Sequence, residues 1–174
     1  MQYYAGITAK CTVGPAGKPC DGKESGQCTG EITLTQLDAA TCKIEYDLKG
    51  GTPGDHGFHI HEKADFSDGC KSAGPHYNPY KRGHGGPTDE ERHVGDLGNV
   101  TFGADGTSKG VIVSNLVKLF GPDSVKVNRP LLCMRSLNPL RDLYALRHLR
   151  VCVCRGGRSW CMLTRTTWAR AGTS

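Results

Sequence analysis

The segment from Gly57 to Asn99 most constrains how this chain can fold. It holds five of the seven histidines, at irregular intervals among glycines, prolines and acids. Apolar residues show no regular period in it, and a segment of this length without its own helix or strand is uncommon in a compact domain and usually functional. We therefore expect a long loop that binds metal through its histidines, carried on a scaffold built by the rest of the chain.

Alternation of apolar and polar residues on both sides of this segment predicts β-strands. The predicted strands are Tyr3–Val13, Glu31–Leu37, Cys42–Leu48, Gly57–His61, Val94–Phe102 and Gly110–Val117. A short turn at Asp38–Thr41 should join the second and third of them as an antiparallel pair. With 24 glycines, 9 prolines and no convincing helix between the strands, the sequence predicts an all-β antiparallel sandwich or barrel.

Length and composition set further limits. At 174 residues and 37% hydrophobic, the chain is long enough for one globular domain with a core. It has no run of about 18 apolar residues, so we predict no membrane-spanning helix. The opening residues, MQYYAGITAKC, lack the features of a secretory signal, which predicts a cytoplasmic protein. The nine cysteines, odd in number and irregularly spaced, are then expected to be mostly free thiols.

Composition changes abruptly after Lys126. The segment 127–174 has nine arginines, no lysine and one acid, Asp142, so it carries a charge of +8 while the whole chain carries +5. The strand alternation also stops there, although the leucines from Leu140 to Leu149 have a spacing that would suit an amphipathic helix. We predict one β domain at 1–126 and a basic tail at 127–174 that is irregular or disordered.

The histidines fall into patterns that suit metal binding. His59 and His61 are separated by one residue, so both imidazoles would project from one face of a strand and could chelate one ion. The other candidates, the last two of which have a spacing that lets a turn bring carboxylate and imidazole together, are His76, His84, His93 and Asp96. Three histidines and an aspartate suit tetrahedral zinc, and imidazole-rich sites also suit copper. Two metals fit these donors better than one.

Other conspicuous residues have simpler interpretations. His56 precedes the chelating pair, and we expect it to be a hydrogen-bonded structural histidine. Cys152 and Cys154 form a CxC pattern that would suit a soft metal. They have no acidic or histidine partner nearby in the sequence, so we interpret them as ordinary tail residues. The acids Asp89–Glu91 are expected to form a solvated face.

Four motifs in a fixed order, GFHIHE, GPHYNP, HGGP and DEERHVGDLGNV, closely resemble the copper/zinc superoxide dismutase family. The resemblance is dense over Gly57–Asn99 and extends from about Gly30 to Val125. It implies an eight-stranded Greek-key β-barrel, an immunoglobulin-like sandwich or barrel. It also implies copper ligands at His59, His61 and His76, and zinc ligands at His76, His84, His93 and Asp96. One departure within the motifs is Ala64, where the family usually has glycine.

The resemblance implies an enzyme that converts superoxide to dioxygen and hydrogen peroxide. His76 would bridge copper and zinc and would be the catalytic residue, because it would take up a proton when it releases copper. The implied partners are superoxide, a second copy of the chain and a copper chaperone, with no nucleic acid and no membrane. Cys70 matches a loop cysteine of the family that is normally tied to a cysteine near the C-terminus, and its partner here is unknown.

The resemblance further implies segments that are missing after Lys126. These are a fourth copper histidine, an acidic loop, an arginine near copper, the disulfide partner and the native C-terminal strand, without which the barrel keeps open edges. Reading Arg158–Ser174 two bases out of phase allows Val-Val-Val-His-Ala-Asp-Glu-Asp-Asp-Leu-Gly-Lys-Gly-Gly-His-Glu, which is similar to the missing segment. We therefore interpret the tail, which has no counterpart in the family, as a retained intron followed by a shifted exon.

Two alternatives to an active dismutase follow from this tail. One is a zinc-binding splice or frameshift product with little or no dismutase activity. The other is an arginine-rich arm that binds nucleic acid or an acidic membrane. Nine arginines without a lysine favour an accident of codon phase over an evolved basic patch.

Overall fold

The computed structural model describes residues 5–14, 28–63, 65, 72–121 and 123–125, together with the backbone of three later strands. The strands are β1 (Ile7–Val13), β2 (Thr29–Gln36), β3 (Cys42–Lys49), β4 (Gly54–Ile60), β5 (Asp96–Phe102), β6 (Thr107–Ser114), β7 (Val151–Arg155), β8 (Arg158–Cys161) and β9 (Arg165–Arg170). The described residues contain no helix. The prediction of an all-β fold is therefore confirmed, and each of the six strands predicted from alternation is present.

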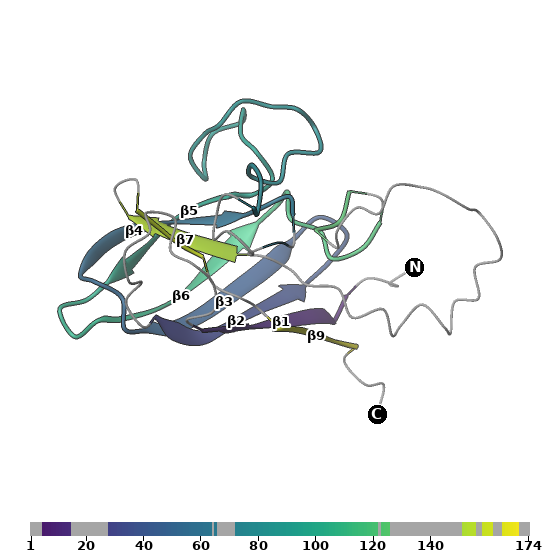
Figure 1. The fold of residues 1–174 in the computed structure, drawn as a ribbon. Helices are drawn as coiled ribbons and strands as arrows, with labels where there is room; N and C mark the ends of the chain where they lie inside the picture. The colour runs from purple at the N-terminus through teal and green to yellow at the C-terminus, as the bar shows by residue number, and fades with distance from the viewer. Residues whose placement is uncertain are drawn as a thin grey trace.

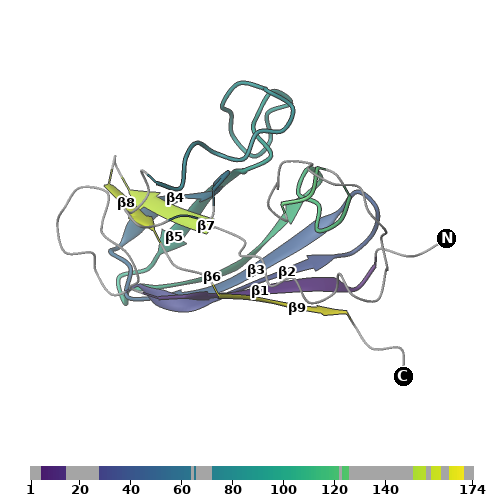
Figure 2. The ribbon, with the colours of Figure 1, turned by 45° about the vertical axis from the view of Figure 1, so that its right-hand side comes forward.

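The strands form two antiparallel sheets that lie over one another (Figures 1 and 2). One sheet has the order β6-β3-β2-β1-β9 and the other has the order β5-β4-β7-β8. After β3 the chain crosses to the second sheet, and β6 then returns to pair with β3 from Cys42↔Ser114 to Lys49↔Thr107. A return of this kind is the connection of a Greek key, in agreement with the predicted Greek-key barrel.

Alternate residues of the strands are buried between the two sheets, as the sequence alternation predicts. Fully buried side chains on β2, β3, β4 and β5 include Ile32, Leu34, Ile44, Phe58 and Val100. Burying each such side chain contributes about 1.5–3 kcal/mol to folding. The buried Gln36 is satisfied, because its amide group donates to the carbonyls of Asp38 and Thr41 and accepts from the amide of Leu119. This core fixes the face of β4 that is left for function.

The turn between β2 and β3 lies at Asp38–Thr41, as predicted. The Oδ1 atom of Asp38 accepts hydrogen bonds from the amides of Ala40 and Thr41 over 2.7 and 2.8 Å. An aspartate side chain that accepts bonds from its own turn stabilises the turn locally. This turn sets the register in which Gln36 pairs with Cys42.

Three short strands, β7, β8 and β9, lie within the segment 127–174. The strand β9 pairs with β1 from Ile7↔Arg170 to Thr12↔Arg165, and β7 pairs with β4 from Gly57↔Cys154 to Ile60↔Val151. An edge of β1 and an edge of β4 present backbone N–H and C=O groups, which the backbone of an added strand can satisfy. The leucine-rich segment from Leu140 to Leu149 lies outside the described residues.

The histidine-rich segment connects β4 to β5. Its described parts project beyond the sheets as the teal loop above β5 in Figure 1. Among the described residues, no helix is long and apolar enough to cross a membrane.

Candidate metal centre

A closed ring of backbone hydrogen bonds ties together the three segments that carry the candidate ligands. The amide of Ile60 donates to the carbonyl of Gly95 over 2.9 Å, the amide of Gly95 donates to Tyr77 over 2.9 Å, and the amide of Tyr77 donates to Ile60 over 2.8 Å. The candidate ligands adjacent to these three residues in the sequence are His59, His61, His76 and Asp96. The ring therefore positions both parts of the centre at once.

Glycine is required at position 95 because the backbones approach closely there. A Cβ atom on Gly95 would lie 2.2 Å from the carbonyl oxygen of Ile60 and 2.9 Å from the amide nitrogen of Tyr77. Atoms cannot approach this closely, so any side chain would force the strands apart. A further isolated antiparallel bridge joins His61 to His76.

Asp96 lies at the centre of three histidines. Its side chain is 1% exposed, and its Oδ1 atom lies 2.7 Å from Nδ1 of His76. Its Oδ2 atom lies 3.0 Å from Nδ1 of His84 and 3.2 Å from Nδ1 of His93. One possible ligand atom from each of the four residues lies within 4.8 Å of the others. Four nitrogen and oxygen donors at this separation suit one tetrahedral zinc ion.

The surroundings of Asp96 keep its carboxylate charged. The backbone amides of Gly85 and His93 donate to Oδ2 over 3.2 and 3.0 Å. Burial alone would raise the pKa of Asp96, but these hydrogen bonds and the contact with His76 outweigh burial and lower the pKa. A metal-binding carboxylate must be deprotonated, and this one is deprotonated at neutral pH.

His59 and His61 lie against the other side of His76. The ring of His59 stacks on that of His76 with centroids 4.1 Å apart, and the centroids of His61 and His76 are 5.2 Å apart. The Nδ1–H group of His61 donates to the carbonyl of Gly74 over 2.8 Å, which leaves Nε2 with a free lone pair. Among the described residues, Nδ1 of His59 and Nε2 of His61 are buried without a hydrogen-bond partner.

Both of these histidines are held in the neutral form that binds metals. Burial is the largest influence on the pKa of His59 and, with the nearby His76, lowers it to about 4. Burial likewise lowers the pKa of His61, against the opposing hydrogen bond to Gly74. A buried polar nitrogen without a partner costs about 1–3 kcal/mol, and a metal ion would satisfy both nitrogens. A ligating histidine usually donates its other N–H group to a carbonyl or carboxylate, as His61 does. These residues therefore fit an ion that prefers imidazole, as copper does.

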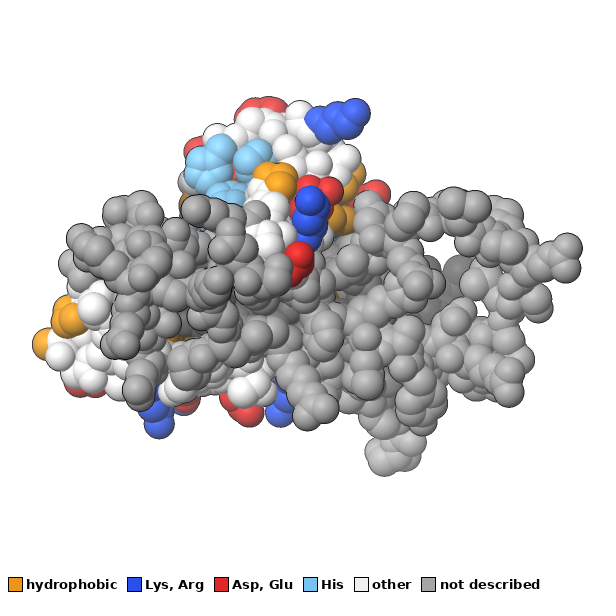
Figure 3. Space-filling model, in the orientation of Figure 1, with side chains coloured by type: hydrophobic (Ala, Val, Ile, Leu, Met, Phe, Trp, Pro, Cys, Tyr) orange, Lys and Arg blue, Asp and Glu red, His pale blue; other side chains and the backbone are white. Residues whose placement is uncertain are grey.

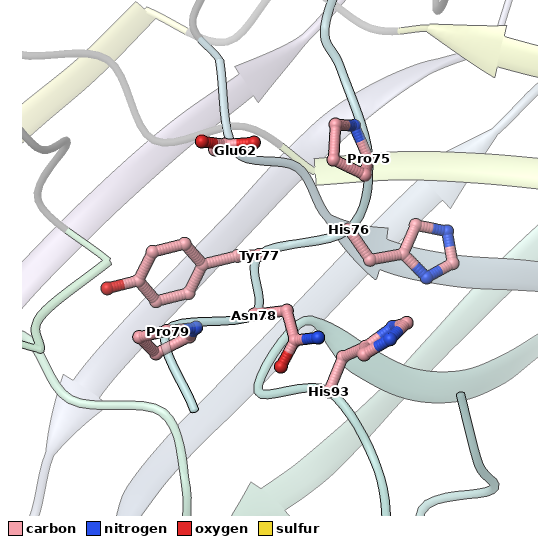
Figure 4. A pocket seen from close by; sticks show the side chains of 7 residues that line it. All are labelled: Glu62, Pro75, His76, Tyr77, Asn78, Pro79 and His93. Atoms are coloured by element: carbon pink, nitrogen blue, oxygen red, sulfur yellow. The ribbon is translucent and has the colours of Figure 1, made fainter. Parts of the chain in front are cut away.

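The centre is open to solvent on one side. The histidines reach the surface as one pale-blue cluster at the top of Figure 3, and the side chain of His84 is 62% exposed. A pocket of about 330 Å³ adjoins them and is lined by Glu62, Pro75, His76, Tyr77, Asn78, Pro79 and His93. The rings of His76 and His93 point the same way while Tyr77 points away from them (Figure 4), and the hydroxyl of Tyr77 donates to the carbonyl of Ser124 over 3.2 Å.

Comparison with known proteins identifies the family. The model of the family described as copper/zinc superoxide dismutase (SODC) matches residues 28–136, more than half of the chain. The chain belongs to the copper/zinc superoxide dismutase family. Copper and zinc are the cofactors of that family, and the group of His76, His84, His93 and Asp96 could hold a metal ion.

Several relatives of this superoxide dismutase family are similar over a little more than half of the chain. The superoxide dismutase [Cu-Zn] of Yarrowia lipolytica is 50% identical over 56% of this chain and 64% of its own length. The extracellular superoxide dismutase [Cu-Zn] of Brugia pahangi is 51% identical over 59% of this chain and 51% of its own length. The superoxide dismutase [Cu-Zn] of Candida glabrata is 52% identical over 58% of this chain and 67% of its own length. The matched part thus spans about half to two thirds of these relatives.

A solved structure has a similar fold. The crystal structure of the clock protein EA4 matches with a TM-score of 0.58 and 35% sequence identity, covering 70% of this chain and 71% of that one. The likeness therefore extends over more than two thirds of both chains.

The remaining residues singled out from the sequence have different outcomes. His56 is structural, as predicted, because it is 2% exposed and its Nε2–H group donates to the carbonyl of Thr52 over 2.7 Å. Cys28 and Cys42 are buried free thiols, and burial raises their pKa values to about 11 and about 12. Cys70 and Ala64 lie outside the described residues.

Sequence reasoning missed the backbone groups that hold the ligands in place. These are the carbonyl of Gly74, the amide of Gly85 and both backbone groups of Gly95. Each is a glycine inside or next to one of the histidine motifs. The glycines therefore carried a signal, since glycine is preferred where a backbone must approach another group closely.

Proposed function

We propose that this chain is a superoxide dismutase, which converts superoxide to dioxygen and hydrogen peroxide. The observation that carries the proposal is the place of His76 between two sets of donors. Its Nδ1 atom lies 2.7 Å from Asp96, while its ring is 4.1 Å from that of His59 and 5.2 Å from that of His61. A histidine that lies between two sets of donors can bridge two ions. The proposed copper ligands are His59, His61 and His76, and the proposed zinc ligands are His76, His84, His93 and Asp96.

Copper, when bound, would supply the one-electron exchange that dismutation requires. The protein contributes orientation and a proton. Contact of Nδ1 with Asp96 fixes the ring of His76 and leaves Nε2 as the nitrogen that exchanges a proton. Burial is the largest influence on the pKa of His76 and lowers it, although Asp96 opposes this.

The proton balance is compatible with a catalytic role for His76. Two superoxide ions and two protons yield one dioxygen and one hydrogen peroxide. His76 would hold one of the protons at Nε2 after the first superoxide is oxidised and would deliver it when the second is reduced, acting as a general acid. The second proton would come from solvent through the exposed side at His84.

The partners and location form part of the same proposal. Superoxide is the proposed substrate, in keeping with the names of the relatives, and a second copy of the chain and a copper chaperone are proposed as further partners, with neither nucleic acid nor membrane. A cytoplasmic location is proposed, although the relative from Brugia pahangi is named extracellular. The division into a domain at 1–126 and a tail at 127–174 is also proposed; the family match ends at residue 136. Cys70 remains the disulfide candidate.

The comparisons do not favour the alternative of a zinc-binding product with little or no dismutase activity, because the similar proteins are named as dismutases. One experiment separates the two. Copper and zinc are quantified on the purified full chain, and superoxide disappearance is measured on the same sample. We expect one copper and one zinc per chain and dismutation that is lost in His76→Ala but kept in Glu90→Gln, an exposed acid of the same loop. Stoichiometric zinc with neither copper nor dismutation would overturn the proposal and support the alternative.

A further inference from the structure

His84 is the most exposed of the proposed zinc ligands. Its side chain is 62% exposed, and its Nδ1 atom lies 3.0 Å from Oδ2 of Asp96. The side chains of His76 and His93 are 23% and 18% exposed, so the protein packs around them more closely. A ligand with little packing around its ring depends on the backbone of its own segment for its position. The segment that leads into His84 is the loop 78–83.

The side chain of Asn78 closes this loop. Its Nδ2 atom donates to the carbonyl of Arg82 over 2.8 Å, and its Oδ1 atom accepts from the amide of Arg82 over 3.0 Å. The backbone adds a longer bond of 3.3 Å from the amide of Lys81 to the carbonyl of Asn78. Lys81 has a φ of 55°, a left-handed conformation that is unfavourable for a residue with a Cβ atom. The two bonds of the Asn78 side chain therefore stabilise a bend that the backbone alone disfavours.

The loop 78–83 is also bonded to the segment that precedes His93. The Nη1 atom of Arg82 donates to the carbonyl of Glu90 over 2.7 Å. The amide of Gly83 donates to the carboxylate of Glu91 over 3.0 Å. The loop that leads into the exposed ligand is thus attached to the segment of a second ligand.

Asn78 lies two positions after His76, on the segment shown in Figure 4. Its two bonds to Arg82 shape the backbone, and groups that orient metal ligands in this indirect way commonly contribute to metal affinity. We propose that Asn78 is a positioning residue of the zinc site, which keeps His84 within reach of the ion by closing the loop 78–83. This inference rests on the proposed zinc ligands and extends them with a residue that acts through the backbone.

The proposed role makes the effect of Asn78 depend on His84. Without the amide of Asn78, His84 should leave the ion more often, and zinc should dissociate faster while the other three ligands remain. Once His84 has been removed, the amide has no ligand left to position. Removing it then should change the zinc affinity no further, whereas a general structural role would weaken zinc binding equally in both proteins.

A double-mutant cycle on zinc affinity tests this dependence. The full chain, loaded with zinc and without copper, competes with a chromophoric zinc chelator as the unsubstituted protein, as Asn78→Ala, as His84→Ala and as the double variant. We expect Asn78→Ala to bind zinc about tenfold more weakly. In the His84→Ala protein, the same substitution should change the affinity by less than about threefold.

Asn99→Ala is the matched control, because it shortens an exposed asparagine of β5. Its zinc affinity should stay within about threefold of that of the unsubstituted protein. Circular dichroism checks that each variant is folded. Should Asn78→Ala not fold, Asn78→Asp replaces it in the cycle. That variant keeps the acceptor for the amide of Arg82 and removes the donor to its carbonyl, so its effect should show the same dependence on His84.

The outcomes separate this inference from the proposed function. A loss of zinc affinity below about threefold in Asn78→Ala, or an equal loss with and without His84, would overturn the positioning role. Superoxide disappearance is measured separately on the chain loaded with copper and zinc. Dependence on His84 in a chain that does not dismutate superoxide would support this inference and overturn the proposed function. Dismutation without that dependence would overturn this inference alone.

Discussion

The two halves of the proposed metal centre, the zinc half around Asp96 and the copper half at His59 and His61, differ in how far their polar groups are satisfied without an ion. On the zinc side, Asp96 holds His76, His84 and His93 within 3.2 Å of its oxygens and is itself held by two backbone amides. On the copper side, the nitrogens of His59 and His61 are buried without partners. One charged group therefore makes the difference, because a carboxylate can satisfy several imidazoles at once. The protein alone preorganises the proposed zinc half, whereas a bound ion would be needed to satisfy the two buried nitrogens of the proposed copper half.

The largest effect is expected from a substitution at Gly95, which should damage the copper half and the zinc half of the centre together. Gly95→Ala would place a Cβ atom 2.2 Å from the carbonyl of Ile60 and break the hydrogen-bond ring that carries the ligands. We expect a loss of about 3 kcal/mol or more in the free energy of unfolding, together with loss of both metals. Urea unfolding with chelator present and metal analysis measure these effects.

Gly83→Ala is the matched control for this substitution. A Cβ atom at position 83 would meet only the side chain of Glu91, at 3.8 Å, so stability should change by less than about 0.5 kcal/mol. Equal stability of the two variants would show that the hydrogen-bond ring does not hold the centre together.

The second largest effect is expected from Asp96→Asn, which should damage the zinc half alone. Asp96→Asn keeps the shape of the side chain but removes the charge that faces three histidines and two amides. We expect zinc affinity to fall by about 100-fold or more, since a ligand is lost outright and the loss of a supporting group alone costs about 10–100-fold. Competition with a zinc chelator measures the change, and Glu90→Gln provides a control for removing an acid from this loop. A fall of less than threefold would exclude Asp96 as a zinc ligand.

Smaller effects are expected from one substitution in each half. Each substitution should weaken the binding of one metal and leave the binding of the other nearly unchanged. His61→Ala removes a nitrogen of the copper half, and we expect copper affinity to fall by about tenfold or more while zinc affinity stays within about threefold. His84→Ala should do the reverse. Its side chain is 62% exposed, so the metal-free protein should keep its stability within about 0.5 kcal/mol. Isothermal titration of each metal into both variants tests the separation, and parallel losses of both metals in either variant would contradict it.

The sequence predicted the two halves better than it predicted what holds them together. The spacing of His59 and His61 on a strand, and of His93 and Asp96 in a turn, is a local property, so it could be read directly. The ring of Ile60, Tyr77 and Gly95 joins segments separated by 17 and 18 positions, and no local period reports such contacts. The one sign of this ring in the sequence was the glycine at position 95.

The strands, too, could be predicted where they depend on local sequence and could not be predicted where they depend on contacts between distant segments. Those in the body alternate between core and surface, and alternation predicted them. The strands β7 and β9 of the tail depend instead on the open edges of β4 and β1. An edge strand is specified by the backbone groups that it meets as much as by its own residues. Alternation within the tail therefore could not reveal them.

The smallest predicted effect concerns protons at the copper half of the metal-free protein. Burial holds the pKa of His59 at about 4, against an ordinary value of 6.5. The unfolded chain therefore binds a proton at this residue below about pH 6.5, whereas the folded protein does not until about pH 4. Because the unfolded state binds more protons in this window, stability is full above pH 6.5 and falls as the pH drops toward 4. Allowing for partial screening by solvent, we expect His59 to contribute a loss of about 1 kcal/mol between pH 7 and pH 5.

Urea unfolding of chelator-treated protein at several pH values measures this contribution. His59→Asn retains a polar side chain but cannot titrate, so its stability should fall less between pH 7 and pH 5 than that of the unsubstituted chain. If His59→Asn leaves the slope unchanged, the buried nitrogens of the copper half are reached by solvent, and the contrast between the halves then rests on Asp96 alone.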